Sequence, residues 1–290
     1  IPHDDPDVAL VGLTGFHHQL DQARGIARRF RERGVPVVCG GPSVSISPER
    51  WRDVADVLVI GEAERTWPAF VRDYARGAHR AEYRETTRPD LALTPVPDYG
   101  GVSPGSARRF FGGIVQTSRG CPFDCEFCDV IVYVGRKMRH KPVETVVREV
   151  DQLHRMGLKA VVLADDNFSG HRARAKQILR GLRGWNRRQR RPMSFITQLS
   201  IDAARDDELL RLCAEAGLNR VCVGIESINP DSLAEAHKTP NLRSVSLEAD
   251  LRRFHAHGIL ILGTTIVGFD NDDLTTFRRL FDFLQAAGVV

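Results

Sequence analysis

Three cysteines stand close together near the middle of the chain, with the spacing C-x-x-x-C-x-x-C. They are Cys121, Cys125 and Cys128. Thiolates are the usual ligands of iron–sulfur cubes, and a cube normally takes four of them. Three closely spaced cysteines can therefore bind three irons and leave the fourth iron without a protein ligand. A small molecule can coordinate an iron that is left open in this way.

Two other uses of a cysteine cluster fit this sequence less well. A structural zinc site normally has four protein ligands in two pairs, and no second C-x-x-C or H-x-x-x-H pair follows at the usual interval. A disulfide framework is disfavoured because the chain has 6 cysteines in 290 residues and shows no apparent secretory leader. Thiols that must stay reduced are expected in the cytoplasm.

The cysteine motif resembles the signature of the radical S-adenosylmethionine (SAM) superfamily. A strand-like run over residues 113–118 precedes Cys121, and an aromatic residue, Phe127, stands directly before Cys128. The resemblance implies a 4Fe-4S cluster whose open iron chelates the amino and carboxylate groups of SAM. One electron from the cluster then cleaves SAM to a 5′-deoxyadenosyl radical, while the protein positions the cofactor and excludes competing reactions.

The composition is that of an ordinary globular chain. Its 290 residues, 42% hydrophobic and 27% charged, have room for two domains. No apolar run approaches the roughly 20 residues of a membrane-spanning helix. The net charge is only +4, and the basic residues are spread over several predicted helices, which argues against nucleic-acid binding. The densest basic run, residues 187–191, is expected to be a solvated helix end.

Strands and helices alternate through the first part of the chain, which favours a parallel sheet joined by helical crossovers. Residues 1–78 are therefore expected to form part of a doubly wound, Rossmann-like domain. The chain starts without a methionine or leader, so a fragment is expected. The predicted strands are 7–13, 35–39 and 57–60, and the predicted helices are 19–33, 48–54 and 62–75.

Glycine-rich turns follow these strands at the sheet edge where ligands of such folds bind. The strands and turns resemble the latter half of the cobalamin-binding domain of cobalamin-dependent radical SAM enzymes. His17 and His18 are each either an axial cobalt ligand or an exposed loop residue, and Cys39 is expected in the core. The resemblance implies a cobalamin site formed by Thr14, Gly15, His17, Gly40, Gly41, Pro42, Ser43, Gly61 and Glu62.

The second part of the chain begins after a polar, proline-containing segment, residues 79–112, which is expected to be an extended linker. Residues 113–290 repeat the strand and helix alternation five times, and a sixth strand is expected to begin at Val289. This pattern predicts a partial barrel of parallel strands. Radical SAM cores have six such units, so the resemblance implies a (β/α)6 barrel that is incomplete at its end. The predicted strands are 113–118, 159–164, 193–199, 220–225 and 259–267.

Polar residues stand at the ends of these strands, where a barrel places its functional groups. Asp165, Asp166 and Asn167 occupy the position at which many radical SAM proteins have a Gly-Gly-Glu that contacts the SAM amino group. The alternative is that they cap a helix. Cys213 and Cys222 are expected in the core, and no titratable residue stands out as a general base.

The resemblance assigns the remaining SAM contacts to other strand ends and to the cysteine loop. Glu226 and Ser227 are expected to bond the ribose hydroxyls, and the Gln198 amide to serve the ribose or the carboxylate. Gly268 is expected to lie beside the adenine ring, on which Phe127 would stack.

Residues 128–139 and 164–170 resemble the cobalamin-type group that contains the hopanoid C-2 methylases. The resemblance implies methyl transfer to an unactivated carbon of a small-molecule or lipid-like substrate, in which one SAM recharges cobalamin and a second yields the radical. A reductant such as flavodoxin or ferredoxin is the expected partner. Two other functions stay open: a cobalamin-independent radical enzyme for coupling, cyclisation or rearrangement, and an iron–sulfur electron carrier or sensor.

Overall fold

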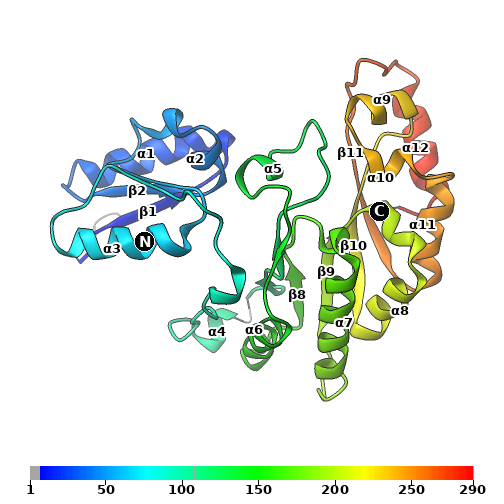
Figure 1. Ribbon diagram of the computed structural model, residues 1–290, viewed down its shortest axis with the longest axis horizontal. Helices are drawn as coiled ribbons and strands as arrows, with labels where there is room; N and C mark the ends of the chain where they lie inside the picture. Colours follow the sequence, from blue (N-terminus) through cyan, green and yellow to red (C-terminus); the bar gives the residue numbers. More distant parts are fainter. Residues whose placement is uncertain (1–6, 108, 290) are drawn as a thin grey trace. The chain divides into compact units, whose positions relative to one another are not determined.

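The computed structural model describes residues 7–107 and 109–289 and divides the chain into two compact units (Figure 1). Unit 1 comprises residues 1–90 together with 132–134, and unit 2 comprises residues 91–131 and 135–290. Among the described residues, no helix is both long enough and apolar enough to cross a membrane.

Unit 1 is built on a parallel sheet of four strands in the order β1-β2-β3-β4. Its strands are β1 (Val11–Thr14), β2 (Val37–Gly40), β3 (Val57–Ile60) and β4 (Glu82–Arg84). Its helices are α1 (Leu20–Arg31), α2 (Pro42–Ile46) and α3 (Ala63–Ala75), with single 3₁₀ turns at His17–Gln19 and Pro48–Trp51.

Both faces of this sheet are buried. Alternate strand residues point to opposite faces, so Cys39 packs in one cluster with Phe30 of α1, while Val38 and Val59 pack in another with Phe70 of α3. Figure 1 shows α1 and α3 on opposite sides of the sheet. The doubly wound arrangement and the core position of Cys39 are confirmed.

Two local predictions for this unit are wrong. The glycine-rich turn expected at residues 40–43, after the second strand, ends at Gly41, and Pro42 and Ser43 open α2, because proline is favourable in the first helical turn. The segment expected to be a linker contains β4, which pairs with β3 and buries Tyr83 to 2% exposure. A strand of three residues with one buried aromatic is too short to show a sequence period.

Unit 2 is built on a parallel sheet of five strands in the order β11-β10-β9-β8-β5, so strands that follow one another in the chain are neighbours. Its strands are β5 (Gly113–Val115), β8 (Ala160–Leu163), β9 (Ser194–Leu199), β10 (Leu218–Glu226) and β11 (Leu260–Thr265), and β6 (Ser118–Arg119) pairs with β7 (Arg139–His140) in an antiparallel hairpin.

The longer helices of unit 2 are α6 (Val143–Arg155), α7 (Arg172–Asn186), α8 (Asp207–Ala216), α11 (Leu247–Ala256) and α12 (Thr276–Ala286). Shorter segments are α4 (Pro104–Ala107), α5 (Val130–Tyr133), which ends inside unit 1, α9 (Pro230–Glu235), α10 (Thr239–Leu242), and 3₁₀ turns at Leu91–Leu93, Phe168–Gly170 and Ile201–Arg205.

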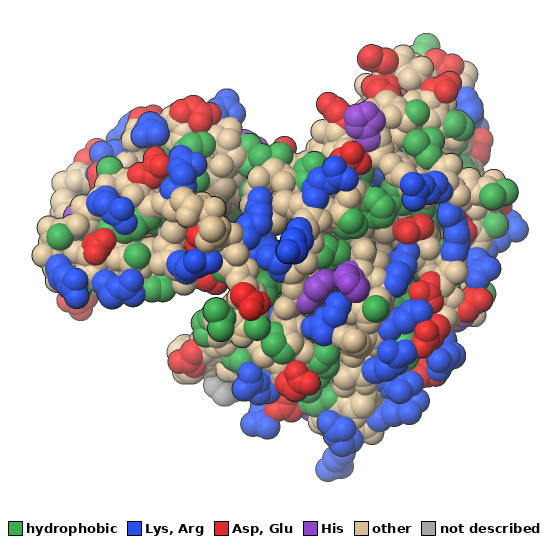
Figure 2. Space-filling model, viewed as in Figure 1, with side chains coloured by type: hydrophobic (Ala, Val, Ile, Leu, Met, Phe, Trp, Pro, Cys, Tyr) green, Lys and Arg blue, Asp and Glu red, His purple; other side chains and the backbone are tan. Residues whose placement is uncertain are grey.

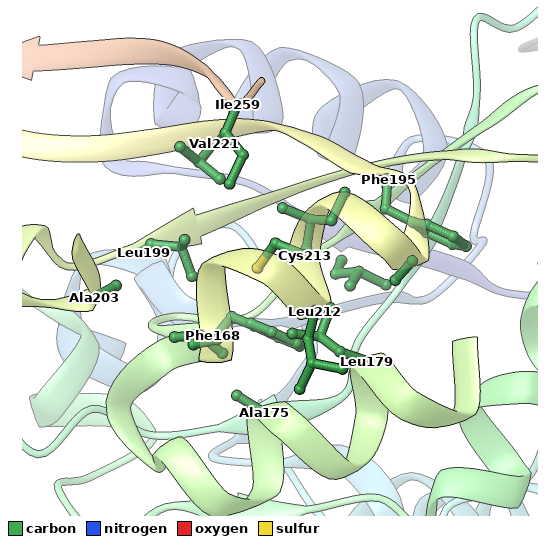
Figure 3. Close-up of a cluster of buried hydrophobic side chains, with 14 of the residues drawn as sticks. Phe168, Ala175, Leu179, Phe195, Leu199, Ala203, Leu212, Cys213, Val221 and Ile259 are labelled. Atoms are coloured by element: carbon green, nitrogen blue, oxygen red, sulfur yellow. The ribbon is translucent and has the colours of Figure 1, made fainter. Parts of the chain in front are cut away.

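The core of unit 2 lies between one face of the sheet and its helices. Figure 3 shows Leu179 of α7 next to Leu212 of α8, which belong to one buried cluster with Phe195 and Leu199 of β9, and all four side chains are at most 1% exposed. Sequential parallel strands covered by helices on one side form a partial barrel, so the predicted architecture is confirmed.

The other face of this sheet is open. Ile114, Val162 and Leu262 alternate with core residues and are 65%, 37% and 58% exposed. Cys222 lies between the buried Val221 and Val223 and is therefore half-buried on the open face, so its predicted core position is wrong.

The sequence analysis expects a sixth strand to begin at Val289. Val289 lies in no strand, and Val290 is outside the described residues. The five strands β5, β8, β9, β10 and β11 therefore make up the barrel that the structure describes.

The basic run after α7 is solvated, as predicted. Arg187, Arg188, Arg190 and Arg191 are all exposed, and Figure 2 shows Lys and Arg side chains gathered at the lower end of unit 2. Positive charge near a helix C-terminus is favourable because it faces the negative end of the helix dipole.

Candidate functional site

The three cysteines lie in the loop between the β6–β7 hairpin strands. Gly120 starts this loop with φ +100°, and a Cβ on it would lie 2.9 Å from the Lys137 carbonyl oxygen, so glycine is required. Cys121 donates its backbone N–H to the Gly135 carbonyl at 3.2 Å, and Cys128 donates to Cys125 at 3.1 Å. The loop is thus a compact turn with its ends joined.

Two aspartates after β8 anchor the start of the loop. Asp165 accepts hydrogen bonds from the backbone N–H groups of Thr117 (2.6 Å) and Ser118 (2.9 Å) and from the Thr117 hydroxyl. Asp166 accepts from the Gly120 backbone N–H at 2.8 Å. The segment that leads into Cys121 is therefore held by carboxylates from the neighbouring strand.

Asp165, for which the sequence analysis gives a SAM contact or a helix cap, is engaged with the backbone of the cysteine loop. Its side chain is buried to 4% exposure, and both carboxylate oxygens bond residues of its own chain. Burial raises its pKa to about 6, although the hydrogen bonds from Thr117 and Ser118 act in the opposite direction. Through these hydrogen bonds Asp165 supports the start of the cysteine loop.

A buried charge pair fixes the other side of the hairpin. Lys141, directly after β7, lies 2.7 Å from Glu149 of α6, and both side chains are at most 6% exposed. The backbone N–H of Lys141 also donates to the Thr117 carbonyl at 2.9 Å. Because removing one member of a buried pair is strongly destabilising, this pair ties the loop to the barrel.

All three thiols border one cavity of 330 Å³ at the carboxyl ends of the barrel strands. They are free and half-buried, and burial raises the pKa of both the Cys121 and the Cys125 thiol. In the described part of the chain, no three His, Cys, Asp or Glu side chains converge on a single ion position. Cube ligands bind three different irons, so the three thiols of a cluster site need not converge on one point.

A buried ion pair borders the same cavity. Lys238 Nζ lies 2.8 Å from Glu226 Oε1 and 5.6 Å from the centre of the Phe127 ring. The two side chains are 13% and 7% exposed. A cation is therefore held between a carboxylate and an aromatic face, beside the cysteine loop.

Gly224 makes room for this pair. A Cβ at that position would lie 2.3 Å from Glu226 Oε1 and 2.6 Å from Lys238 Nζ. Any side chain there would displace the ion pair from the cavity wall. Glycine near the end of β10 thus leaves the space that the ion pair occupies, although glycine weakens strand interiors.

The sequence analysis does not find Lys238. It stands in a short connection between α9 and α10 (Thr239–Leu242), in a stretch without a strand end to mark it. Only the folding of this segment back over β10 brings its ammonium group to Glu226. The local signal is a lysine 12 residues after a strand-end glutamate, which is not specific.

The structure brings together some of the predicted SAM contacts and not others. Ser227 is 3% exposed, and its hydroxyl accepts from the Asn229 backbone N–H at 3.0 Å. Gly268 is exposed and donates its N–H to Asp272 at 2.8 Å. Neither residue borders the cavity. The predicted residues that do border it are Cys121, Cys125, Cys128, Phe127, Asp165, Asp166, Asn167, Gln198 and Glu226.

In unit 1, the predicted cobalamin residues gather at the carboxyl ends of the strands. Thr14 ends β1, Gly40 ends β2 and Gly61 follows β3. Gly41 has φ +96°, and a Cβ there would lie 2.3 Å from Thr14 Oγ1. Gly15 follows Thr14 along the same edge, so small residues leave the strand ends uncovered by bulky side chains.

Several residues at this edge also have structural partners. Ser43 is 2% exposed; its hydroxyl lies 3.0 Å from His17 Nδ1 and accepts from Trp51 Nε1 at 3.0 Å. His18 is exposed and stacks on Phe16, which is the position of a loop histidine. Ser43 therefore orients the His17 ring at the sheet edge.

Glu62 and Gly61 border a separate cavity of 220 Å³ in unit 1. The Glu62 carboxylate is 7% exposed and lies 3.5 Å from Arg88 Nη1. The Gly61 backbone N–H donates to Ser45 Oγ at 2.9 Å. This end of the sheet is thus held by polar contacts within the unit.

The chain resembles known methyltransferases over nearly its whole length. It is 33% identical over 282 residues to an uncharacterised methyltransferase of Synechocystis sp., covering 97% of this chain and 52% of that protein. It is 31% identical to the hopanoid C-2 methylase of Rhodopseudomonas palustris, covering 96% of this chain and 53% of that protein. The chain thus spans about half the length of the curated relatives it matches.

Solved structures share its fold. The radical SAM methyltransferase TsrM from Kitasatospora setae, solved with cobalamin and a [4Fe-4S] cluster, has a TM-score of 0.79 at 19% identity and is matched over 97% of this chain and 62% of its own. The cobalamin-dependent SAM radical enzyme OxsB, solved with aqua-cobalamin and SAM, has a TM-score of 0.74 at 21% identity, over 95% of this chain and 43% of its own.

The family model described as the radical SAM superfamily matches residues 115–284. This range contains the cysteine loop, the cavity and the barrel strands β8, β9, β10 and β11. The cofactors of that superfamily are a 4Fe-4S cluster and SAM, in agreement with the three thiols that border one cavity. The chain belongs to the radical SAM superfamily.

Proposed function

We propose that this protein is a cobalamin-dependent radical SAM methyltransferase that methylates an unactivated carbon of a small-molecule or lipid-like substrate. The observation that carries the proposal is the cavity of 330 Å³ that joins the three thiols, the Lys238–Glu226 pair, Phe127 and Gln198. The relatives named as methyltransferases support the reaction type.

The cysteine loop supplies the cluster ligands in this proposal. Cys121, Cys125 and Cys128 would each bind one iron, and the bound cluster would supply the electron that cleaves SAM. Metal binding requires thiolates, so each ligand loses its proton as the cluster is assembled. The hydrogen bonds that Asp165 and Asp166 accept from the backbone N–H groups of Ser118 and Gly120 hold the loop before the cluster binds.

The remaining cavity residues would bind SAM. The Lys238 ammonium can pair with the SAM carboxylate, while Glu226, next to it, can accept hydrogen bonds from the ribose hydroxyls. Phe127 is 40% exposed and presents its ring to the cavity, where adenine can stack. Gln198, the exposed residue of β9 on the open face, adds an uncharged amide.

Cobalamin is proposed for unit 1, where it would carry the methyl group when bound. The fit lies in the sheet edge formed by Thr14, Gly15, Gly40 and Gly41, whose small side chains let a flat ring approach the backbone. His17, oriented by Ser43, stands at the same edge. A cytoplasmic location and a flavodoxin or ferredoxin as electron donor complete the proposal, since the thiols need a reducing compartment.

Product analysis of the full-length protein tests this function. The protein is reconstituted anaerobically with iron and sulfide, supplied with hydroxocobalamin, and incubated with SAM and a strong reductant. Bound corrinoid bands, together with both S-adenosylhomocysteine and 5′-deoxyadenosine, are expected. Formation of 5′-deoxyadenosine alone, without bound corrinoid, would identify a cobalamin-independent radical enzyme. An intact cluster without SAM cleavage would leave an electron carrier or sensor as the function.

A further inference from the structure

The side chain of Asn167 contacts a cluster ligand directly. It stands after β8 and is buried to 4% exposure at the wall of the cavity. Its Nδ2 donates to Cys121 Sγ at 3.8 Å and to Ser200 Oγ at 3.3 Å. The sequence analysis places Asn167 among the SAM contacts, but both of its amide hydrogens point at groups of its own chain.

Two buried serines fix the orientation of this amide. Ser169 Oγ donates to Asn167 Oδ1 at 2.9 Å, and Ser169 Oγ and Ser200 Oγ lie 3.2 Å apart. Ser169 and Ser200 are 2% and 9% exposed. Because the hydroxyl of Ser169 supplies a donor to the amide oxygen, the amide nitrogen is left to face the sulfur. A flipped amide would put a carbonyl oxygen against a thiolate, which is an acceptor facing an acceptor.

We propose that Asn167 is a positioning residue that tunes the reduction potential of the cluster through its hydrogen bond to Cys121. Reduction adds one negative charge to the cluster and its thiolates. An N–H group aimed at a ligand sulfur stabilises that added charge and raises the potential. This inference rests on the cluster assignment proposed above, but it concerns the potential and not the presence of the cluster.

The contact is selective for one of the three ligands. Cys121 accepts hydrogen bonds from Asn167 and from the backbone N–H of Phe123. The pKa of the Cys125 thiol is instead raised mainly by burial, while the charge of Lys238 acts in the opposite direction. The effect of the Asn167 amide can therefore be removed without changing the loop that carries the cysteines. Its replacement by Asp keeps the size of the side chain and exchanges the N–H donor for a carboxylate oxygen.

Redox titration followed by electron paramagnetic resonance tests the proposal on the reconstituted full-length protein without SAM. At the midpoint of the wild type, we expect N167D to lower the ratio of reduced to oxidised cluster about tenfold, or about 59 mV for one electron. N167A is expected to shift the ratio in the same direction by about threefold. An exchangeable proton coupled to the reduced cluster should disappear in N167A.

A second buried asparagine serves as the matched control. Asn186 is 6% exposed and also uses its whole amide, donating to the Met193 and Ala216 carbonyls and accepting from the Met193 N–H. N186A is expected to lower the stability of the barrel and to leave the cluster midpoint unchanged. A merely structural role for Asn167 would give the same result as N186A.

The outcomes separate the two assignments. A wild-type protein that binds no cluster would overturn the cluster assignment itself. A cluster that is retained in N167D and N167A with the wild-type midpoint would overturn the role of Asn167. If both variants lose the cluster, the double variant S169A/S200A decides, because it removes both hydroxyls that orient the amide while leaving Asn167 in place. A wild-type midpoint in S169A/S200A would then contradict the proposal.

Discussion

The Lys238–Glu226 ion pair allows a quantitative test of the cavity. The two charges lie 2.8 Å apart, and their side chains are only 13% and 7% exposed. Replacing Lys238 by Met keeps a long apolar stem but removes the charge that faces Glu226. The remaining carboxylate would then lie buried without its cation, and such a loss typically costs about 3 to 5 kcal/mol.

The expected result for K238M is a decrease of about 3 kcal/mol in the free energy of unfolding, at the low end of that range because water still reaches the pair. The double variant E226Q/K238M should lose less, because its side chains leave no charge unpaired. Urea unfolding followed by circular dichroism measures the free energies of the wild type, K238M, E226Q and the double variant, which together form a double-mutant cycle. The coupling between the two substitutions is expected to be about 2 kcal/mol.

An exposed ion pair provides the control for this measurement. Arg252 and Glu248 form an i,i+4 pair on α11 with side chains 67% and 38% exposed. R252M should therefore cost no more than about 0.5 kcal/mol. If K238M cost as little as R252M, or if the effects of the single substitutions simply added, the pair would not be a buried, coupled element of the cavity.

Three other predictions address the site. Cys125→Ala should abolish the cluster absorbance and reduce bound iron in the reconstituted protein, whereas Cys213→Ala, in the core, should not. Burial raises the pKa of Asp165 from 3.8 to about 6, so the stability that its protonated form contributes is present below pH 3.8 and is lost as the pH rises through about 6. In urea unfolding, the wild type should therefore lose about 3 kcal/mol of stability relative to D165N between pH 4 and 7. Gly224→Ala would put a Cβ 2.6 Å from the Nζ of Lys238 and should weaken SAM binding about tenfold by calorimetry.

The order of strands and helices could be predicted because it depends on local patterns. The strand over 57–60 is observed at the predicted residues, and the strand predicted at 193–199 is observed as Ser194–Leu199. The strand β4 was not predictable, because its three residues are held by pairing with β3 rather than by their own period. The half-buried position of Cys222 depends on which face of β10 is covered, and that is a property of the assembled barrel.

The site was predictable where residue type and spacing carry the chemistry. The three cysteines could be found from their spacing alone, and the structure places all of them on one cavity. Asp165 and Glu226 look alike in the sequence, since each is an acid at a strand end. Burial separates them: Asp165 bonds the backbone of the cysteine loop, while Glu226 pairs with Lys238, which is distant from any motif.

The end of β10 combines irregular backbone with the charged wall of the cavity. Glu226 has φ +62°, a conformation that costs a residue other than glycine roughly 1 to 2 kcal/mol, and the pairing of β10 with β11 shifts register between Gly224 and Glu226. Asn241 of α10 holds this strand end by donating Nδ2 to the carbonyls of Gly224 (3.1 Å) and Ile225 (2.9 Å). Strained residues persist where the surroundings fix them, and they concentrate at functional sites. The same short segment that carries Lys238 thus also carries the asparagine that stabilises the strained turn, so one connection both shapes the strand end and supplies the charge that its glutamate needs.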